Sequence, residues 1–158
     1  MSVRKGERTE GKLRVLTCAE ALSRYTMTIC RNEKVMPKSQ RWLLTQRIVG
    51  AALGAVECIT KANSAPLNEP VGVAMRYIWQ LQARANLRTL LTLLDLAHAA
   101  FGLELHRVEH WTELTVETDK CLSAWIKSDR QRAKLPGIHD VISALQPAIL
   151  AVLGLAEK

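Results

Sequence analysis

The sequence predicts an all-α protein, an antiparallel up-down four-helix bundle with a C-terminal helical extension. Three observations carry this prediction. Leu and Ala dominate the apolar residues, which favours helices over strands. Apolar residues recur at steps of three and four in four separate segments, as on one side of a helix. Short stretches containing Pro or Gly separate those segments. The length of 158 residues and the 48% hydrophobic content suit one domain with a real core.

The chain divides into three parts by composition. Residues 1–11 have almost no apolar content, and we expect a mobile basic N-terminal arm. Residues 12–134 hold the four periodic segments of the bundle. Residues 135–158 form the C-terminal helical extension, which follows Pro136-Gly137 and contains Pro147. We expect this extension to pack on the bundle or on a partner.

The first two helices are predicted over residues 12–33 and after Pro37. The first has a regular apolar seam: Val15, Cys18, Leu22, Tyr25 and Ile29. The second has another, which Trp42 widens: Leu44, Ile48, Ala52, Ala55 and Ile59. Gly50 and Gly54 lie inside the second helix, where each costs about 1 kcal/mol relative to Ala. Our first explanation is that another helix crosses close to these glycines, and our second is a subunit contact. A third is that the bundle simply tolerates their cost.

The third helix is predicted over residues 71–100 and the fourth over 104–127. The expected buried side of the third comprises Ala74, Ile78, Leu81, Ala85, Leu90, Leu91, Leu94 and Ala97. That of the fourth comprises Trp111, Leu114, Thr118, Cys121 and Trp125. Gly102 between the two helices is available as a C-cap.

Charge is distributed unevenly along this basic chain. The formal net charge is +7, and residues 1–68 carry twelve Lys and Arg against five Asp and Glu. Such a distribution favours an anionic partner, most often nucleic acid, although a solvated basic face explains it equally well. The third helix carries a stripe with no acidic residue one turn away: Arg76, Arg84 and Arg88.

Two further basic clusters are predicted at opposite ends of the bundle. Near the first turn lie Arg31, Lys34, Lys38 and Arg41, and at the end of the fourth helix lie Lys127, Arg130 and Arg132. The fourth helix also carries an acidic row, Glu109, Glu113 and Glu117. We expect this row to pair with basic neighbours, within one chain or between subunits.

Three segments carry a family resemblance. They are YTMTICRNEKVMPKSQRW at residues 25–42, QRIVGAALGAVECITKAN at 46–63 and EHWTELTVETDKCLSAWIKSDRQR at 109–132. The chain resembles, over about residues 12–134, the accessory variability proteins of diversity-generating retroelements. Proteins encoded in intervening sequences of bacterial 23S ribosomal RNA genes are related bundles. The resemblance implies a non-catalytic homopentamer that binds a reverse transcriptase and nucleic acid, either template RNA or cDNA, and supports mutagenic reverse transcription. A bundle of the intervening-sequence type and a structural homo-oligomer that binds only protein remain alternatives.

No catalytic or metal-binding motif is convincing. His106, Glu109 and His110 match HxxEH, but no third ligand can be identified, so we expect no metal site, cofactor or enzymatic activity. The four cysteines form no CxxC pair and are expected to be small core residues of a cytoplasmic protein. Residues 1–12 are too polar for a signal peptide. Gln46, Glu57 and Lys61 argue against a membrane span in the second helix.

Overall fold

The computed structural model describes residues 5–133 together with Ser143 and Pro147, and it contains four long helices. These are α1 (Lys5–Arg31), α2 (Gln46–Ser64), α3 (Pro70–Phe101) and α4 (Leu105–Ala133). Two short helical turns precede α2: η1, a 3₁₀ turn (Lys38–Gln40), and η2, a π turn (Arg41–Thr45). The described part of the chain contains no strand, which confirms the all-α prediction.

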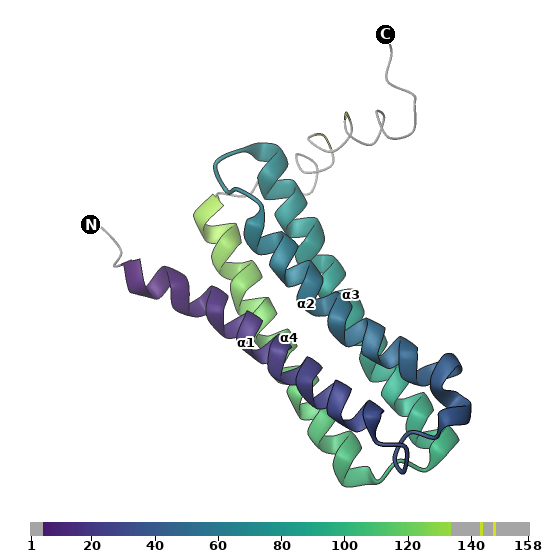
Figure 1. The fold of residues 1–158 in the computed structure, drawn as a ribbon. Coiled ribbons are helices and arrows are strands. Elements are labelled where there is room, and N and C mark those ends of the chain that lie inside the picture. Colours follow the sequence, from purple (N-terminus) through teal and green to yellow (C-terminus); the bar gives the residue numbers. More distant parts are fainter. Residues whose placement is uncertain (1–4, 134–142, 144–146, 148–158) are drawn as a thin grey trace.

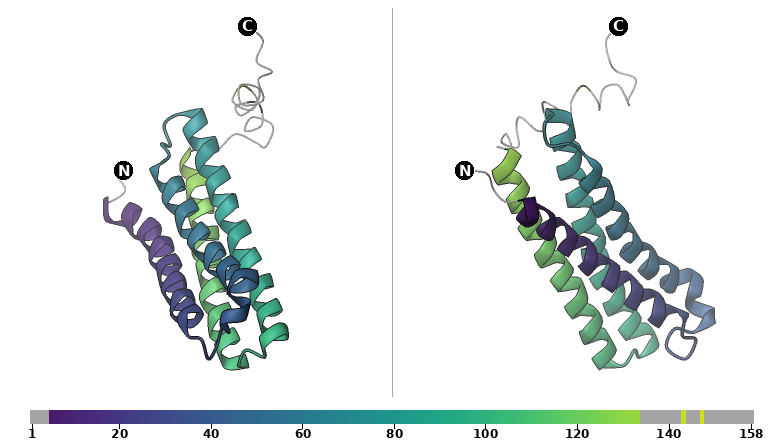
Figure 2. Two further views of the ribbon diagram at one scale, coloured as in Figure 1. Left: turned by 45° about the vertical axis from the view of Figure 1, so that its right-hand side comes forward. Right: turned by 60° about the vertical axis from the view of Figure 1, so that its left-hand side comes forward.

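The helices form an antiparallel bundle (Figure 1). Each packs on two neighbours: α1 on α2 and α4, and α3 on α2 and α4. Successive helices run in opposite directions, so the turns between α1 and α2 and between α3 and α4 share one end of the bundle (Figure 2). The turn between α2 and α3 lies at the other end, beside the end of α4. This arrangement is the predicted up-down-up-down topology.

The core of α1 and α2 follows the predicted seams closely. Val15, Leu22 and Ile29 are buried on α1, and Ile48 and Ile59 are buried on α2. On α4, the predicted anchors Trp111 and Trp125 are also buried, at 0% and 3% exposure. These positions were predictable because the large apolar residues of each seam recur at steps of three and four.

The buried side of α3 differs from the prediction in its first half. Leu81 is 42% exposed and Ala85 is also exposed, so both assignments to the core are wrong. The observed seam steps by three and four without interruption: Val73, Arg76, Gln80, Ala83, Leu87, Leu90, Leu94 and Ala97. Arg76 and Gln80 are polar, and a search for apolar periodicity therefore selects the neighbouring, more exposed side.

The helix boundaries also differ from the predicted ones. α1 begins at Lys5, within the segment expected to be a mobile arm, and α4 continues to Ala133 rather than ending at Lys127. Gly102 adopts a left-handed φ of 63°, and its N–H donates to the His98 carbonyl at 3.0 Å. This is the C-cap expected for a glycine at that place. The predicted extension over residues 135–158 lies outside the described residues, apart from Ser143 and Pro147.

The π turn before α2 changes which residues face outward. Trp42 and Leu43 are 77% and 68% exposed, although Trp42 was expected to widen the apolar side of the second helix. A π turn closes its hydrogen bonds from i to i+5 and is wider than an α turn. The angular position of Trp42, extrapolated from α2 with 3.6 residues per turn, is therefore wrong.

One stretch among the described residues, Trp42–Ser64, is long and apolar enough to cross a membrane by length and composition alone. From Ile48 onward, one side of this stretch packs into the bundle core. Ile48, Ala55 and Ile59 are each 1% exposed or less and belong to the same core as Leu22 and Leu90. We therefore assign this stretch to the bundle core.

Candidate nucleic-acid interface

Arg76 does not belong to an exposed basic stripe on α3. Its side chain is 3% exposed, and its Nε donates to Asp129 Oδ2 on α4 at 2.6 Å. Its Nη1 donates to the carbonyl oxygens of Ala62 and Ala65 at the end of α2, both at 3.0 Å. The guanidinium thus binds two carbonyls at the end of the helix, of which that of Ala62 also accepts the Ala65 N–H at 3.3 Å, and it lies at the negative end of the helix dipole. The predicted role of Arg76 as an accessible binding residue is wrong.

Gln80 and Trp125 complete the surroundings of this ion pair. Gln80 Nε2 donates to the same Asp129 Oδ2 at 2.8 Å, and the Arg76 guanidinium carbon lies 5.0 Å from the centre of the Trp125 ring. Two polar positions of the α3 seam therefore meet the one charged position of the α4 seam. The cluster joins three helices at the end of the bundle where α2 turns into α3.

Arg84 is also paired, and only Arg88 of the predicted stripe remains available. Arg84 Nε donates to Asp119 Oδ1 at 3.2 Å, and its Nη2 donates to Ser123 Oγ at 2.7 Å. Arg88 is exposed and makes no ion pair with another described residue. No acidic partner lies one turn away along α3, and the observed partners come from α4, which only the fold brings alongside.

The cluster near the first turn is exposed. Arg31 and Lys34 have no ion-pair partner within residues 5–133, whereas Lys38 Nζ lies 3.1 Å from Glu33 Oε1. Asn32 Oδ1 accepts the Lys34 backbone N–H at 3.1 Å, which orders the turn after α1. The side chain of Arg41 is outside the part of the structure that is described.

The cluster at the end of α4 lies at the opposite end of the bundle, as predicted (Figure 1). Lys127 and Arg132 are exposed and unpaired among the described residues. Arg130 is engaged, because its guanidinium carbon lies 5.0 Å from the centre of the Tyr77 ring and its Nη2 donates to the Tyr77 hydroxyl.

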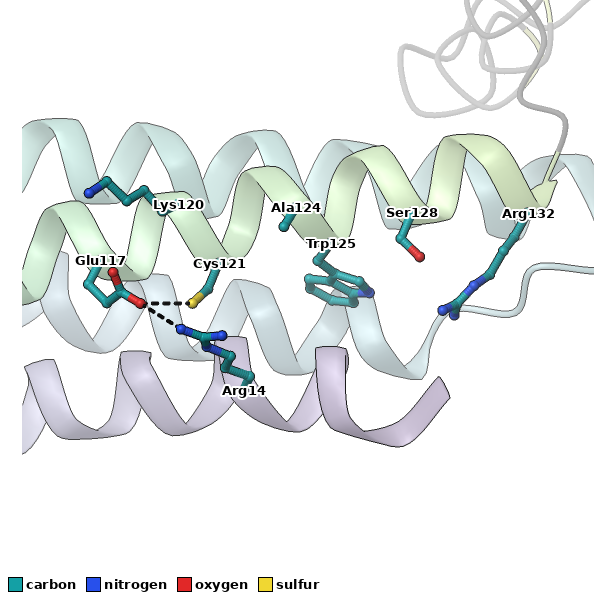
Figure 3. A pocket seen from close by; sticks show the side chains of 8 residues that line it. All are labelled: Arg14, Glu117, Lys120, Cys121, Ala124, Trp125, Ser128 and Arg132. Carbon is teal, nitrogen blue, oxygen red and sulfur yellow. Dashed lines mark hydrogen bonds and ion pairs between the residues drawn. The ribbon is translucent and has the colours of Figure 1, made fainter. Parts of the chain in front are cut away.

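A hollow of about 430 Å³ opens along α4 beside α1. Figure 3 shows its lining: Arg14, Glu117, Lys120, Cys121, Ala124, Trp125, Ser128 and Arg132. The cations Lys120 and Arg132 come from α4, and Arg14 comes from α1. Sequence analysis named Arg132 but missed Lys120 and Arg14. Most of the α4 residues in the lining recur at steps of three and four, so the α4 side of the hollow was detectable from their spacing. Arg14 was not, because it lies 103 residues from its partner Glu117.

The acidic row of α4 makes one ion pair with another helix and one within α4. Glu117 Oε1 lies 3.1 Å from Arg14 Nη2, and Glu113 Oε2 lies 3.7 Å from His110 Nδ1. Glu109 is exposed, without a partner in the described chain. The α3 cations pair with Asp119 and Asp129 instead of this row. The expected pairing between neighbouring helices is therefore present for Glu117, while most of it uses acids that were not selected from the sequence.

The two glycines of α2 differ. A Cβ at Gly54 would lie 2.9 Å from Asn86 Nδ2 on α3, so the close helix crossing that we preferred is found there. A Cβ at Gly50 would meet no atom within 4 Å, and this residue is exposed. The close-crossing explanation is therefore wrong for Gly50.

The HxxEH histidines are held in separate local contacts. His106 Nε2 lies 3.5 Å from Glu104 Oε2, and the Tyr25 ring meets the His110 ring edge-on with centroids 4.8 Å apart.

Among the described residues, the one group with metal-ligand geometry comprises Cys18, Glu117 and Cys121. The Cys18 and Cys121 sulfurs lie 3.5 Å apart, and Cys121 Sγ lies 3.7 Å from Glu117 Oε1.

The environment of Cys121 disfavours its thiolate in the metal-free protein. Burial raises the pKa of the Cys121 thiol to about 11, and the contact with Cys18 acts in the same direction. The nearby guanidinium of Arg14 opposes this rise. Of the four cysteines expected to be small core residues, Cys58 and Cys121 are buried and Cys18 and Cys30 are partly buried. The contact between Cys18 and Cys121 was not predicted.

Comparison with protein-family models finds no match for this chain, and comparisons with curated proteins and with solved structures find none either.

Proposed function

We propose that this protein is a non-catalytic accessory factor of a diversity-generating retroelement, which binds nucleic acid and the reverse transcriptase through basic surfaces. The observation that carries the nucleic-acid part is the selective exposure of cations. Arg76 is buried, and Arg84 and Arg130 are engaged by partners nearer the surface. Lys120, Lys127 and Arg132, in contrast, remain exposed and unpaired on α4 among the described residues. Unpaired cations on one helix provide contacts to phosphate.

The character of the hollow suggests contact with the phosphate backbone rather than with bases. Trp125 is 3% exposed, so its ring is not available as a stacking platform. Lys120 and Arg132 offer charge from the rim of the hollow (Figure 3). Contacts of this kind give affinity and position without reading the sequence.

The identity of the partners rests on the sequence resemblance. The reverse transcriptase, template RNA or cDNA, and a cytoplasmic setting are what the resemblance to accessory variability proteins implies. The four-helix bundle is the fold expected of that family, and free cysteines suit a reducing compartment. A neighbouring reverse transcriptase gene with a repeat pair is the genomic observation that supports this assignment most directly.

The binding test removes the exposed cations without disturbing the core. A triple variant, Lys120→Gln with Lys127→Gln and Arg132→Gln, is compared with the wild type by fluorescence anisotropy on labelled single-stranded RNA over a salt series. Each lost phosphate contact should reduce the log–log salt slope by about 0.7. A matched variant at the opposite end, Arg31→Gln with Lys34→Gln, shows which cluster contributes. Unchanged affinity and slope in both variants, together with unchanged capture of the reverse transcriptase, would overturn the proposal.

A second candidate, a structural homo-oligomer, is favoured by exposed apolar surface. Trp42 and Leu43 project from η2, and a hollow of about 600 Å³ beside them is lined by Met27, Cys30, Arg31, Trp42, Thr45, Gln46 and Val49. Exposed large apolar side chains gathered around a hollow are typical of protein interfaces. This surface also suits the subunit contacts of the proposed homopentamer, so self-association and nucleic-acid binding are compatible.

A further inference from the structure

Cys18, Cys121 and Glu117 are in contact, and none of the three has a role in the function proposed above. Cys18 belongs to α1, whereas Cys121 and Glu117 lie one turn apart on α4. Their ligand atoms all lie within 4.8 Å of one another. Glu117 and Cys121 belong to the lining of the hollow, beside Arg14 (Figure 3). Two helices thus present two sulfurs and a carboxylate to one point.

Two of the three ligand separations match the edges of a tetrahedral zinc site, and the third is within 4.8 Å. With Zn–S near 2.3 Å and Zn–O near 2.1 Å, two tetrahedral sulfur ligands lie about 3.8 Å apart, and a sulfur and an oxygen lie about 3.6 Å apart. The observed separations are 3.5 Å between Cys18 Sγ and Cys121 Sγ and 3.7 Å between Cys121 Sγ and Glu117 Oε1. A disulfide would instead require the sulfurs to approach to about 2.05 Å.

We propose that Cys18 Sγ, Cys121 Sγ and the Glu117 carboxylate bind one Zn²⁺ ion, with water from the hollow as the fourth ligand. Two thiolates select a borderline-soft ion such as Zn²⁺ or Cd²⁺ over Mg²⁺ and Ca²⁺. Arg14 holds the carboxylate through its 3.1 Å contact, as outer-shell partners do in metal sites. Its charge also balances the site, because two thiolates, one carboxylate and Zn²⁺ leave a single negative charge.

The bound ion would fasten α1 to α4. These helices hold the ligands 103 residues apart in the chain, and the described residues contain no disulfide between them. Because the ligands come together only in the folded bundle, zinc binds the native state in preference to the unfolded chain and stabilises it.

The test uses Zn²⁺ and its spectroscopic substitute Co²⁺ on the full chain, handled anaerobically. The wild type should bind one equivalent of Co²⁺, with thiolate-to-cobalt charge-transfer absorption that Zn²⁺ abolishes by displacement. Zn²⁺, but not Mg²⁺, should also raise the melting temperature. Cys18→Ser and Cys121→Ser should remove the charge-transfer band. Glu117→Gln, which changes a half-exposed side chain and leaves the core intact, should weaken Zn²⁺ binding by about tenfold or more.

Matched variants separate this site from the other candidate ligands. Cys30→Ser, Cys58→Ser and the double variant His106→Gln with His110→Gln should bind Zn²⁺ as the wild type does. The proposal is overturned if the wild type gives no charge-transfer band, if Cys18→Ser and Cys121→Ser bind with unchanged affinity, or if binding disappears with the two histidines. Retained tight binding in Glu117→Gln would remove the carboxylate from the ligand set.

Discussion

Arg76 shows how a charged residue can occupy a core position. It donates to Asp129 and to two carbonyls that end α2, so its donors are largely used inside the protein. Some atoms of the cluster nevertheless find no partner among the described residues, namely Arg76 Nη2, Asp129 Oδ1 and Trp125 Nε1. An ion pair that is buried but incompletely satisfied contributes little net stability as a pair, yet each member depends strongly on the other.

Replacing Arg76 with Met should therefore destabilise the protein severely. The change leaves Asp129 buried without its cation, and we expect a loss of about 3–5 kcal/mol in the free energy of unfolding. Urea denaturation followed by circular dichroism measures it. Arg84→Gln is the matched control, and its effect should be no more than about 1 kcal/mol because that ion pair is partly exposed.

The double variant Arg76→Met with Asp129→Leu tests the reason for that loss. Because it removes both buried charges, it should recover most of the stability lost in Arg76→Met. Equal stability of Arg76→Met and the wild type would mean that the guanidinium is not buried as described.

Cys30 should react slowly with alkylating reagents in the folded protein. Burial raises the pKa of its thiol from 9.0 to about 12, so the reactive thiolate is scarce at pH 8. Its rate should rise with pH up to the raised pKa, and unfolding in urea should accelerate it at fixed pH. Iodoacetamide labelling followed by peptide mass spectrometry measures both effects. A folded-state rate equal to the unfolded-state rate would contradict this environment.

At the scale of single helices, the glycines of α2 give a matched pair. Gly50→Ala should stabilise the protein by about 1 kcal/mol, because helix propensity improves and no atom obstructs the added methyl group. Gly54→Ala gains the same propensity but displaces the Asn86 amide, which also donates to Cys58 Sγ at 3.7 Å. It should therefore be clearly less stable than Gly50→Ala by thermal and urea denaturation.

Two additional measurements help to explain the stabilities of these two glycine variants. Combining Asn86→Ala with Gly54→Ala should relieve the crowding and reduce the difference in stability between the Gly54→Ala and Gly50→Ala variants. A change of subunit number in Gly50→Ala would identify Gly50 as a subunit contact, our second explanation for this residue. Equal stabilisation by both alanines would contradict the close crossing at Gly54.

Helix seams were predictable from sequence where large apolar residues recur regularly along them. Val15, Leu22 and Ile29 on α1 required nothing beyond their spacing. The seam of α3 passes through Arg76 and Gln80, whose burial depends on an aspartate 53 and 49 residues away, respectively. Periodicity on one helix holds no information about that partner, so the predicted buried side wrongly included Leu81.

In the candidate site too, the features that follow from helix order could be predicted, whereas contacts between residues far apart in sequence could not. Its helical end clusters could be located because the antiparallel topology fixes which helix ends meet. The hollow could not, because Arg14 reaches it from α1 while its other residues come from α4. The cysteine pair escaped detection for the same reason, since metal motifs are sought at short spacings.

For the whole molecule, we predict a pentamer in solution that depends on the surface around Trp42. Burial of Trp42 and Leu43 in a subunit contact would remove two large exposed side chains from water. Trp42→Ser with Leu43→Ser should shift the mass measured by light scattering toward the monomer while leaving the helical signal intact. Leu96→Ser, at another exposed apolar site, is the control. A monomeric wild type at micromolar concentration would contradict the assembly.

The packing of α1 on α4 cannot be completed until the ribosome has synthesised α4. Trp111 Nε1 donates to Thr26 Oγ1 at 2.8 Å in the core, across 85 residues of sequence. At about 5–20 residues per second, the first helix waits about 4–17 s for this partner to be synthesised. During that interval the side of α1 that later packs on α4 has nothing to cover it. Chains that stop before α4 would therefore carry an uncovered apolar surface, which makes them substrates for chaperones and prone to aggregation.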